Sequence, residues 1–169
     1  MNLRAYAKLL KNYLYDILLI KLNKQLKLKP LFFVYHLTSK CNFNCDFCYY
    51  KNKLNLHREL NLKEVDELLN VIQKESKFIY FNGGEPLVRE DIIDIVKIPK
   101  KKGFITAVNT NMSQIHKKME ILDCTDYLVA SLHRINNPEK YSKILGTNVS
   151  TINKIKDNII TCAKLQKDR

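Results

Sequence analysis

The feature that most constrains the fold is an alternation of strand-like and helix-like segments from residue 31 onwards. Runs rich in β-branched and aromatic residues cover 31–37, 78–81, 104–108 and 126–131. Segments with apolar residues three and four positions apart follow them, at about 61–74, from about 90 to Pro99, through 115–122, and at about 149–164 after a loop with Pro138 and Gly146. This spacing is typical of β–α units with a parallel sheet. We therefore expect an α/β protein whose helices cover one face of a curving sheet.

Polar and reactive residues follow the predicted strands, where the carboxyl ends of parallel strands share one edge. A cysteine-containing loop follows the first strand, Gly83 and Gly84 follow the second, Asn109 and Thr110 end the third, and Ser131 ends the fourth. In β–α folds of this kind the functional loops gather at that edge. Four strand ends thus predict one common site.

Cys41, Cys45 and Cys48 are the strongest chemical signal, because they are spaced four and three residues apart in one loop. A [4Fe–4S] cluster normally takes four cysteine ligands, so three would leave one iron free to bind something else. A zinc site with His36 or His57 as the fourth ligand is an alternative. Cys124 and Cys162 are scattered, and we interpret them as incidental thiols in a reducing compartment.

The order of these motifs resembles the radical S-adenosylmethionine (SAM) superfamily over about residues 31–166. The cysteine triplet, with Phe47 before its third cysteine, is similar to the cluster-binding motif of that family, and 82–86 resembles its Gly-Gly-Glu motif. The resemblance implies a partial (β/α) TIM-like barrel, with about four of six β/α units present here.

The resemblance also implies the cofactors and the reaction. The three cysteines would hold a [4Fe–4S] cluster whose free iron binds SAM, and a low-potential electron donor would drive reductive cleavage of SAM to a 5′-deoxyadenosyl radical, which abstracts hydrogen from an unknown substrate. Gly84 and Glu85 would contact the methionine amino group, and Phe47 would lie near the adenine. The residues that match cofactor-binding positions are Phe47, Gly83, Gly84, Glu85, Asn109, Thr110 and Ser131.

The chain departs from the family pattern in supplying only four of the six expected strands. We expect truncation before strand five, completion of the barrel by a partner chain, or a noncatalytic iron–sulfur or zinc-binding module or subunit. An unpaired edge strand is an association hazard, which favours the first two explanations.

Residues 1–29 are expected to form a basic amphipathic helix, separate from a core domain at 30–169. The chain carries a net charge of +12, and seven of its 29 basic residues fall in the first 30 positions (Arg4, Lys8, Lys11, Lys21, Lys24, Lys27, Lys29). Apolar residues in the same segment form a stripe: Leu3, Tyr6, Leu10, Tyr13, Leu14 and Ile17. Such a helix packs on its own protein or a partner helix, or lies on a membrane surface; nucleic-acid binding is the least favoured role. Nothing at the N-terminus resembles a signal peptide, so we expect a cytoplasmic protein, peripheral to the membrane if the helix binds lipid.

Overall fold

The computed structural model describes residues 3–21, 29–50 and 58–167, and its centre is one parallel sheet. The strands are β1 (Phe33–His36), β2 (Phe78–Asn82), β3 (Ile105–Thr110) and β4 (Tyr127–Ala130). They lie in the order β1-β2-β3-β4, and every neighbouring pair is parallel. The expected α/β fold with four successive strands is thus confirmed.

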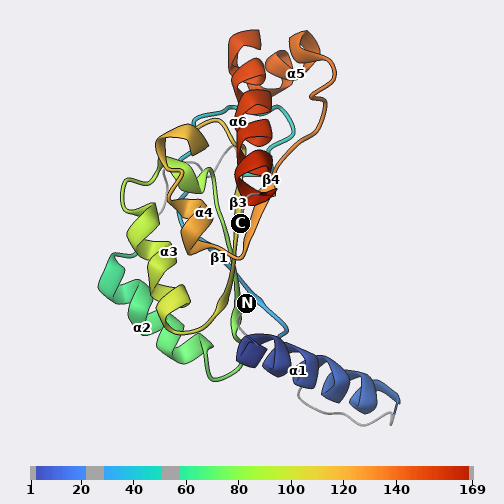
Figure 1. Cartoon of the computed structure of the whole chain (residues 1–169), viewed down its shortest axis with the longest axis vertical. Helices are drawn as coiled ribbons and strands as arrows, with labels where there is room; N and C mark the ends of the chain where they lie inside the picture. The colour runs from blue at the N-terminus through green and yellow to red at the C-terminus, as the bar shows by residue number, and fades with distance from the viewer. Residues whose placement is uncertain (1–2, 22–28, 51–57, 168–169) are drawn as a thin grey trace.

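The helices follow the strands along the chain. They are α2 (Leu62–Ile72), α3 (Ile92–Lys101), α4 (Ile121–Cys124), α5 (Pro138–Leu145) and α6 (Val149–Lys167), with 3₁₀ turns η2 (Pro86–Val88) and η3 (Ile115–Lys117). Figure 1 shows α2, α3 and α4 on one side of the sheet, and α1 (Leu3–Lys21) extending away from its lower end.

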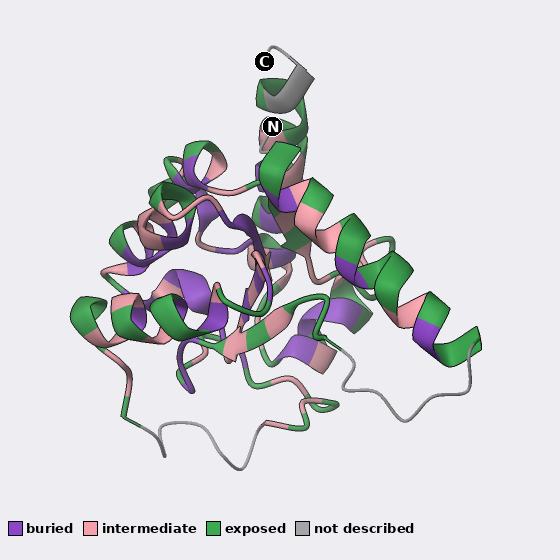
Figure 2. Cartoon of the chain, turned by 90° about the horizontal axis from the view of Figure 1, so that it is seen from below, coloured by how far each residue is buried: buried purple, intermediate pink, exposed green. Residues whose placement is uncertain are grey.

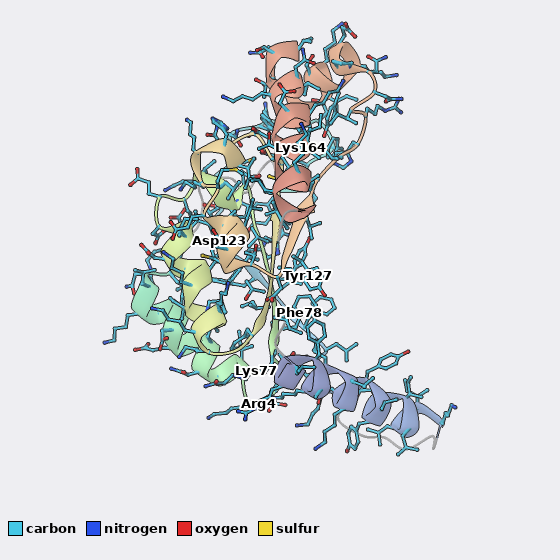
Figure 3. The ribbon with its side chains drawn as sticks, in the orientation of Figure 1. Arg4, Lys77, Phe78, Asp123, Tyr127 and Lys164 are labelled. Carbon is cyan, nitrogen blue, oxygen red and sulfur yellow. The ribbon has the colours of Figure 1, made fainter. Side chains whose placement is uncertain are left out.

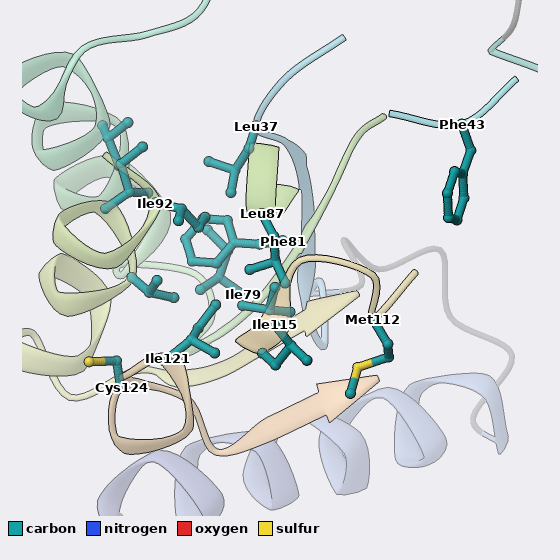
Figure 4. Packing of buried hydrophobic residues seen from close by; sticks show 14 of the residues in the cluster. Leu37, Phe43, Ile79, Phe81, Leu87, Ile92, Met112, Ile115, Ile121 and Cys124 are labelled. Carbon is teal, nitrogen blue, oxygen red and sulfur yellow. The ribbon is translucent and has the colours of Figure 1, made fainter. Parts of the chain in front are cut away.

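The core lies between the sheet and these helices. On β2, Ile79 and Phe81 are fully buried, whereas Phe78 and Tyr80, which point to the other face, are partly exposed. The buried strand residues pack against Ile92 and other apolar residues of the helices (Figure 4). Cys124 belongs to this core, as expected for an incidental thiol. One face of the sheet is therefore covered by helices, and the other is more open.

Three local expectations were wrong. Pro99 does not end α3 but lies inside it, two residues before the last; a proline this close to the end removes only one backbone hydrogen bond, and its ring is buried. The predicted helix through 115–122 is divided into η3 and α4. The expected loop around Pro138 contains helix α5, which Asn137 caps and which Gly146 ends in the left-handed conformation.

The N-terminal helix is present over residues 3–21, and the rest of the predicted segment up to residue 28 lies outside the described residues. None of the helices in the described ranges combines the length and apolarity needed to cross a bilayer.

Candidate functional site

The three clustered cysteines border one small hollow next to the carboxyl edge of the sheet. A space of about 40 Å³ is lined by Cys41, Cys45 and Cys48 together with Gly83, Gly84 and two neighbours. All three thiols are free and half-buried. The cysteine loop and the Gly83–Gly84 turn therefore form one site although they lie some forty residues apart in the chain.

A larger pocket of about 220 Å³ opens beside this hollow and collects every residue that the sequence predicted for the site. These ten residues are Cys41, Cys45, Phe47, Cys48, Gly83, Gly84, Glu85, Asn109, Thr110 and Ser131. They come from the carboxyl end of β3 and from the loops after the other three strands, as the shared edge of a parallel sheet requires.

The two glycines allow the turn after β2 to lie directly against the loop after β1. The Gly84 N–H donates to the Thr38 carbonyl at 2.7 Å. A Cβ atom on Gly84 would lie 2.1 Å from the Lys40 carbonyl oxygen, and one on Gly83 would lie 2.4 Å from that of Thr38. Gly83 also has a φ of +144°, a backbone conformation that residues other than glycine rarely adopt. The close approach that needs these glycines is therefore between two segments of the chain.

Glu85 joins the ends of β2 and β3. Its carboxylate is buried and accepts hydrogen bonds from the Leu87 N–H at 3.0 Å, the Thr110 hydroxyl at 2.7 Å and the Asn111 N–H at 2.7 Å. Burial raises the pKa of this carboxyl group, while the three donors oppose that shift. A carboxylate has about four acceptor positions, so roughly one remains for a ligand. Thr110 is itself buried, and it contributes to the site by the hydrogen bond that orients the Glu85 carboxylate.

Asn109 and Ser131 form the part of the edge between β3 and β4. The Ser131 hydroxyl donates to the Asn109 side-chain oxygen at 2.8 Å. Both residues line the pocket and are partly exposed, so their remaining donors and acceptors can meet a ligand.

Further pocket residues were not predicted. His133 lies edge-on to Phe47, with ring centroids 4.5 Å apart, and 6.4 Å from the ring of Tyr141, so the three rings line one side of the pocket. Tyr141 lies on α5, which the sequence reading took for a loop, and His133 had no motif to single it out. The other unpredicted lining residues are Phe43, Tyr49, Tyr50, Asn82, Asn111 and Leu145.

Helix α5 also holds the cysteine loop in place. The Asn44 N–H donates to the Leu145 carbonyl at 3.1 Å, and the Asp46 N–H donates to the Ile144 carbonyl at 3.0 Å. These bonds satisfy carbonyls at the last turn of α5, which have no partner within the helix.

A zinc ion held by the three thiols would require them to converge on one point. Among the described residues, no group of three His, Cys, Asp or Glu side chains is arranged around a single ion. A cluster bonds each thiolate to a different iron, so its ligands stand further apart. His36 stacks on Tyr50 and does not line the cysteine pocket, and His57 lies outside the described residues. The arrangement gives the zinc alternative no support.

Burial raises the pKa of Cys41 and of Cys45 in the cluster-free chain. It raises the pKa of Cys45 to about 11, with a further contribution from the nearby Cys41 and Cys48. Ligation needs the thiolate form, so metal binding at this loop releases protons.

Comparison with known proteins agrees with this fold. Residues 35–168 match the radical SAM superfamily, and the chain belongs to that family. Its enzymes bind a [4Fe–4S] cluster and SAM. Membership implies SAM-dependent radical chemistry.

Curated relatives match most of the chain but carry different names. A probable GTP 3′,8-cyclase of Thermococcus kodakarensis is 33% identical over 66% of this chain and 38% of its own length. A GTP 3′,8-cyclase of Aquifex aeolicus is 30% identical over 79% of this chain and 43% of its own length. An Fe-coproporphyrin III synthase of Methanosarcina barkeri is 31% identical over 51% of this chain and 22% of its own length. The chain thus spans less than half the length of these relatives.

A solved structure shares the fold. SuiB of Streptococcus suis, determined with bound SAM, superposes with a TM-score of 0.61 at 22% identity, over 75% of this chain and 30% of that protein. At this identity the likeness concerns the fold alone.

Proposed function

We propose that this chain holds a [4Fe–4S] cluster with Cys41, Cys45 and Cys48, binds SAM in the adjoining pocket, and cleaves it reductively to start hydrogen abstraction. The observation that carries the proposal is the shared hollow of the three thiols and the Gly83–Gly84 turn, which opens beside a pocket lined by all predicted SAM-binding residues. Three ligands to a four-iron cluster leave one iron for SAM.

When bound, the cluster and SAM supply one-electron cleavage of a sulfonium bond, for which a low-potential electron donor is required. The protein residues bind and orient SAM. Glu85 has an acceptor position for the methionine amino group, and Asn109 and Ser131 have polar atoms for ribose or carboxylate. Phe47 and His133 offer aromatic surface to the adenine.

The matched segment supports a SAM-binding function more strongly than any one substrate. The GTP 3′,8-cyclases and the Fe-coproporphyrin III synthase both align with it, although their names specify different chemistry. GTP is the first substrate to test, because GTP 3′,8-cyclases match the largest share of the chain. Function depends on the site rather than the fold, so this remains a candidate.

The test is anaerobic reconstitution of the whole chain with iron and sulfide. We expect a cluster whose electron paramagnetic resonance spectrum changes when SAM is added, and release of 5′-deoxyadenosine under dithionite. Cys48→Ala should lose the SAM-responsive spectrum, whereas Cys162→Ala, which alters a cysteine outside this pocket, should retain it.

The outcomes separate this proposal from its rivals. A cluster that does not respond to SAM would indicate a noncatalytic iron–sulfur module or subunit. Colourless protein with bound zinc would contradict the cluster assignment itself. Added GTP tests the substrate: if 5′-deoxyadenosine forms with SAM but the GTP is unchanged, the radical function stands and the cyclase candidate fails.

A further inference from the structure

Polar side chains of helix α1 hydrogen-bond to the rest of the protein. The Lys8 ammonium donates to the Gln73 carbonyl at 2.7 Å and to the Lys74 carbonyl at 3.2 Å, just beyond the end of α2. Asn12 is 5% exposed and donates to the Glu75 carbonyl at 3.1 Å. A cation at this position also compensates the negative end of the α2 dipole.

Four leucines of α1 face away from these contacts. Ala5, Asn12 and Leu19 are the buried residues of the helix, and their spacing of seven places them on one face. Leu3, Leu10, Leu14 and Leu18 lie on the opposite side, with Leu10 58% and Leu14 56% exposed. Figures 2 and 3 show the exposed residues along α1 and its side chains extending beyond the sheet. None of the six stripe residues expected from the sequence is buried.

Basic and aromatic side chains border this exposed stripe. Arg4 and Lys11 lie along one side of it, and Lys21 lies at its end; all three are exposed. Tyr13 and Tyr15 are exposed as well. The one acidic residue of the helix, Asp16, accepts a hydrogen bond from the Lys29 N–H. The stripe of four leucines therefore has positive charge along one side and at its end. It also has exposed tyrosines beside it, and tyrosines prefer an interface between apolar and aqueous surroundings.

We propose that α1 binds the surface of an anionic lipid bilayer, with its leucine stripe in the boundary between headgroups and acyl chains. An amphipathic helix with leucines on one side and basic residues beside them binds such surfaces through both forces. The net charge of +12 favours an anionic surface over a second copy of this chain, which the same charge repels. This inference goes beyond the proposed SAM chemistry and does not depend on it.

Lipid binding through α1 leaves the cysteine pocket open. The helix contacts residues 73–75, which precede β2, and Tyr6 shares a hydrogen bond of 2.6 Å with Tyr127 at the start of β4. These contacts lie at the amino-terminal edge of the sheet, whereas the pocket lies at the carboxyl edge. A membrane-bound protein would thus present its pocket to soluble molecules.

The experiment is co-sedimentation of the whole chain with vesicles of phosphatidylcholine, alone or mixed with phosphatidylglycerol. We expect binding to the anionic vesicles only, weakening as salt is raised. The double variant Leu10→Glu/Leu14→Glu should lose binding, while Val71→Glu, which adds a charge at an exposed apolar position on α2, should keep it. Arg4→Gln/Lys11→Gln should weaken binding by about tenfold or more.

A second double variant controls for the loss of two positive charges as such. Lys117→Gln/Lys143→Gln also removes two charges, from exposed positions on η3 and α5, which follow the carboxyl ends of β3 and β4, and should change binding much less. Equal effects of the two pairs, or no sedimentation with any vesicle, would overturn the proposal. Light scattering tests whether the leucine stripe instead binds a second copy of the chain. In that case the wild-type chain would be a dimer, and Leu10→Glu/Leu14→Glu would convert it to a monomer.

Discussion

At the scale of single residues, the site depends on positions where no side chain fits. Gly83 and Gly84 were expected at cofactor-binding positions, with Gly84 contacting the methionine part of SAM, whereas the space that their missing side chains leave is filled by the backbone after β1. The two roles are compatible, because Gly83 and Gly84 also line the pocket. The motif therefore also has a structural function, which is to bring the cysteine loop and the second strand end together.

Gly84→Ala should destabilise the cluster-free chain by about 3 kcal/mol, because its Cβ meets backbone atoms that no rotamer change can move. Gly146→Ala is the matched control. Its φ of +63° should cost about 1 kcal/mol. Its Cβ would lie 3.2 Å from the Asn44 carbonyl oxygen, a tight contact but much less so than the 2.1 Å at Gly84. Urea unfolding measures both. If the two variants unfold at the same urea concentration, the close packing of the turn is not what selects glycine.

At the scale of elements, the sequence predicted well those strands and helices whose formation depends on residues within the same segment. The strands follow from β-branched and aromatic runs, and α2 follows from its apolar spacing. In the structure a capping box of Asn61 and Glu64 begins α2. Helix α5 was missed because Pro138 suggested a loop, although proline is favourable in a first turn. For the same reason, the sequence did not predict that Tyr141 of α5 lines the pocket.

The direction in which α1 faces could not be predicted from its own sequence. A stripe of apolar residues predicts an amphipathic helix but does not say which side contacts the protein. The side of α1 that contacts the protein is fixed in part by the backbone carbonyls of residues 73–75, which accept hydrogen bonds from Lys8 and Asn12. These partners are more than sixty residues away in the chain, and no local pattern encodes them.

The start of α2 should show a measurable dependence on pH. The Arg58 guanidinium donates to both oxygens of Glu64 at 2.8 Å, and this pair, with the Asn61 N–H, lowers the pKa of Glu64 from 4.5 to about 2. A lowered pKa adds stability above pH 4.5 that is lost as the pH falls towards 2. Glu64→Gln keeps the capping box but not the charge, so the difference in stability between wild type and variant should shrink over that range.

The measurement is urea unfolding of both proteins at several pH values from 6 down to the lowest at which they still fold. Glu67→Gln on the same helix is the control, since Glu67 is exposed and its ion pair with Lys63 is a long contact of 4.0 Å. A wild-type advantage over Glu64→Gln that stays constant as the pH is lowered would contradict the assignment.

At the scale of the whole molecule, the site is where all four β–α units meet. Each strand end supplies pocket residues, and α5 adds its carbonyls to the cysteine loop. A group bound there contacts segments that only the folded chain brings together, so its binding free energy adds to the stability of the fold.

Cluster loading should therefore raise the melting temperature of the protein. A gain of about 3 to 4 kcal/mol, as for a ligand well above its dissociation constant, corresponds to roughly 5 to 15 °C for a chain of this size. Anaerobic scanning calorimetry before and after reconstitution measures it. Cys48→Ala should show no increase and Cys162→Ala the full one. An equal increase in both would mean that the iron stabilises the chain from some other place.

The hydrogen bonds between the cysteine loop and α5 also set an order of events during synthesis. Asn44 and Asp46 emerge from the ribosome about 100 residues before their partners Leu145 and Ile144, which at 5 to 20 residues per second is roughly 5 to 20 s. Throughout that interval the three thiols belong to a loop without its native supports, exposed to oxidants and to competing metals. We expect cluster delivery in the cell to follow completion of α5 rather than to accompany translation of the cysteine motif.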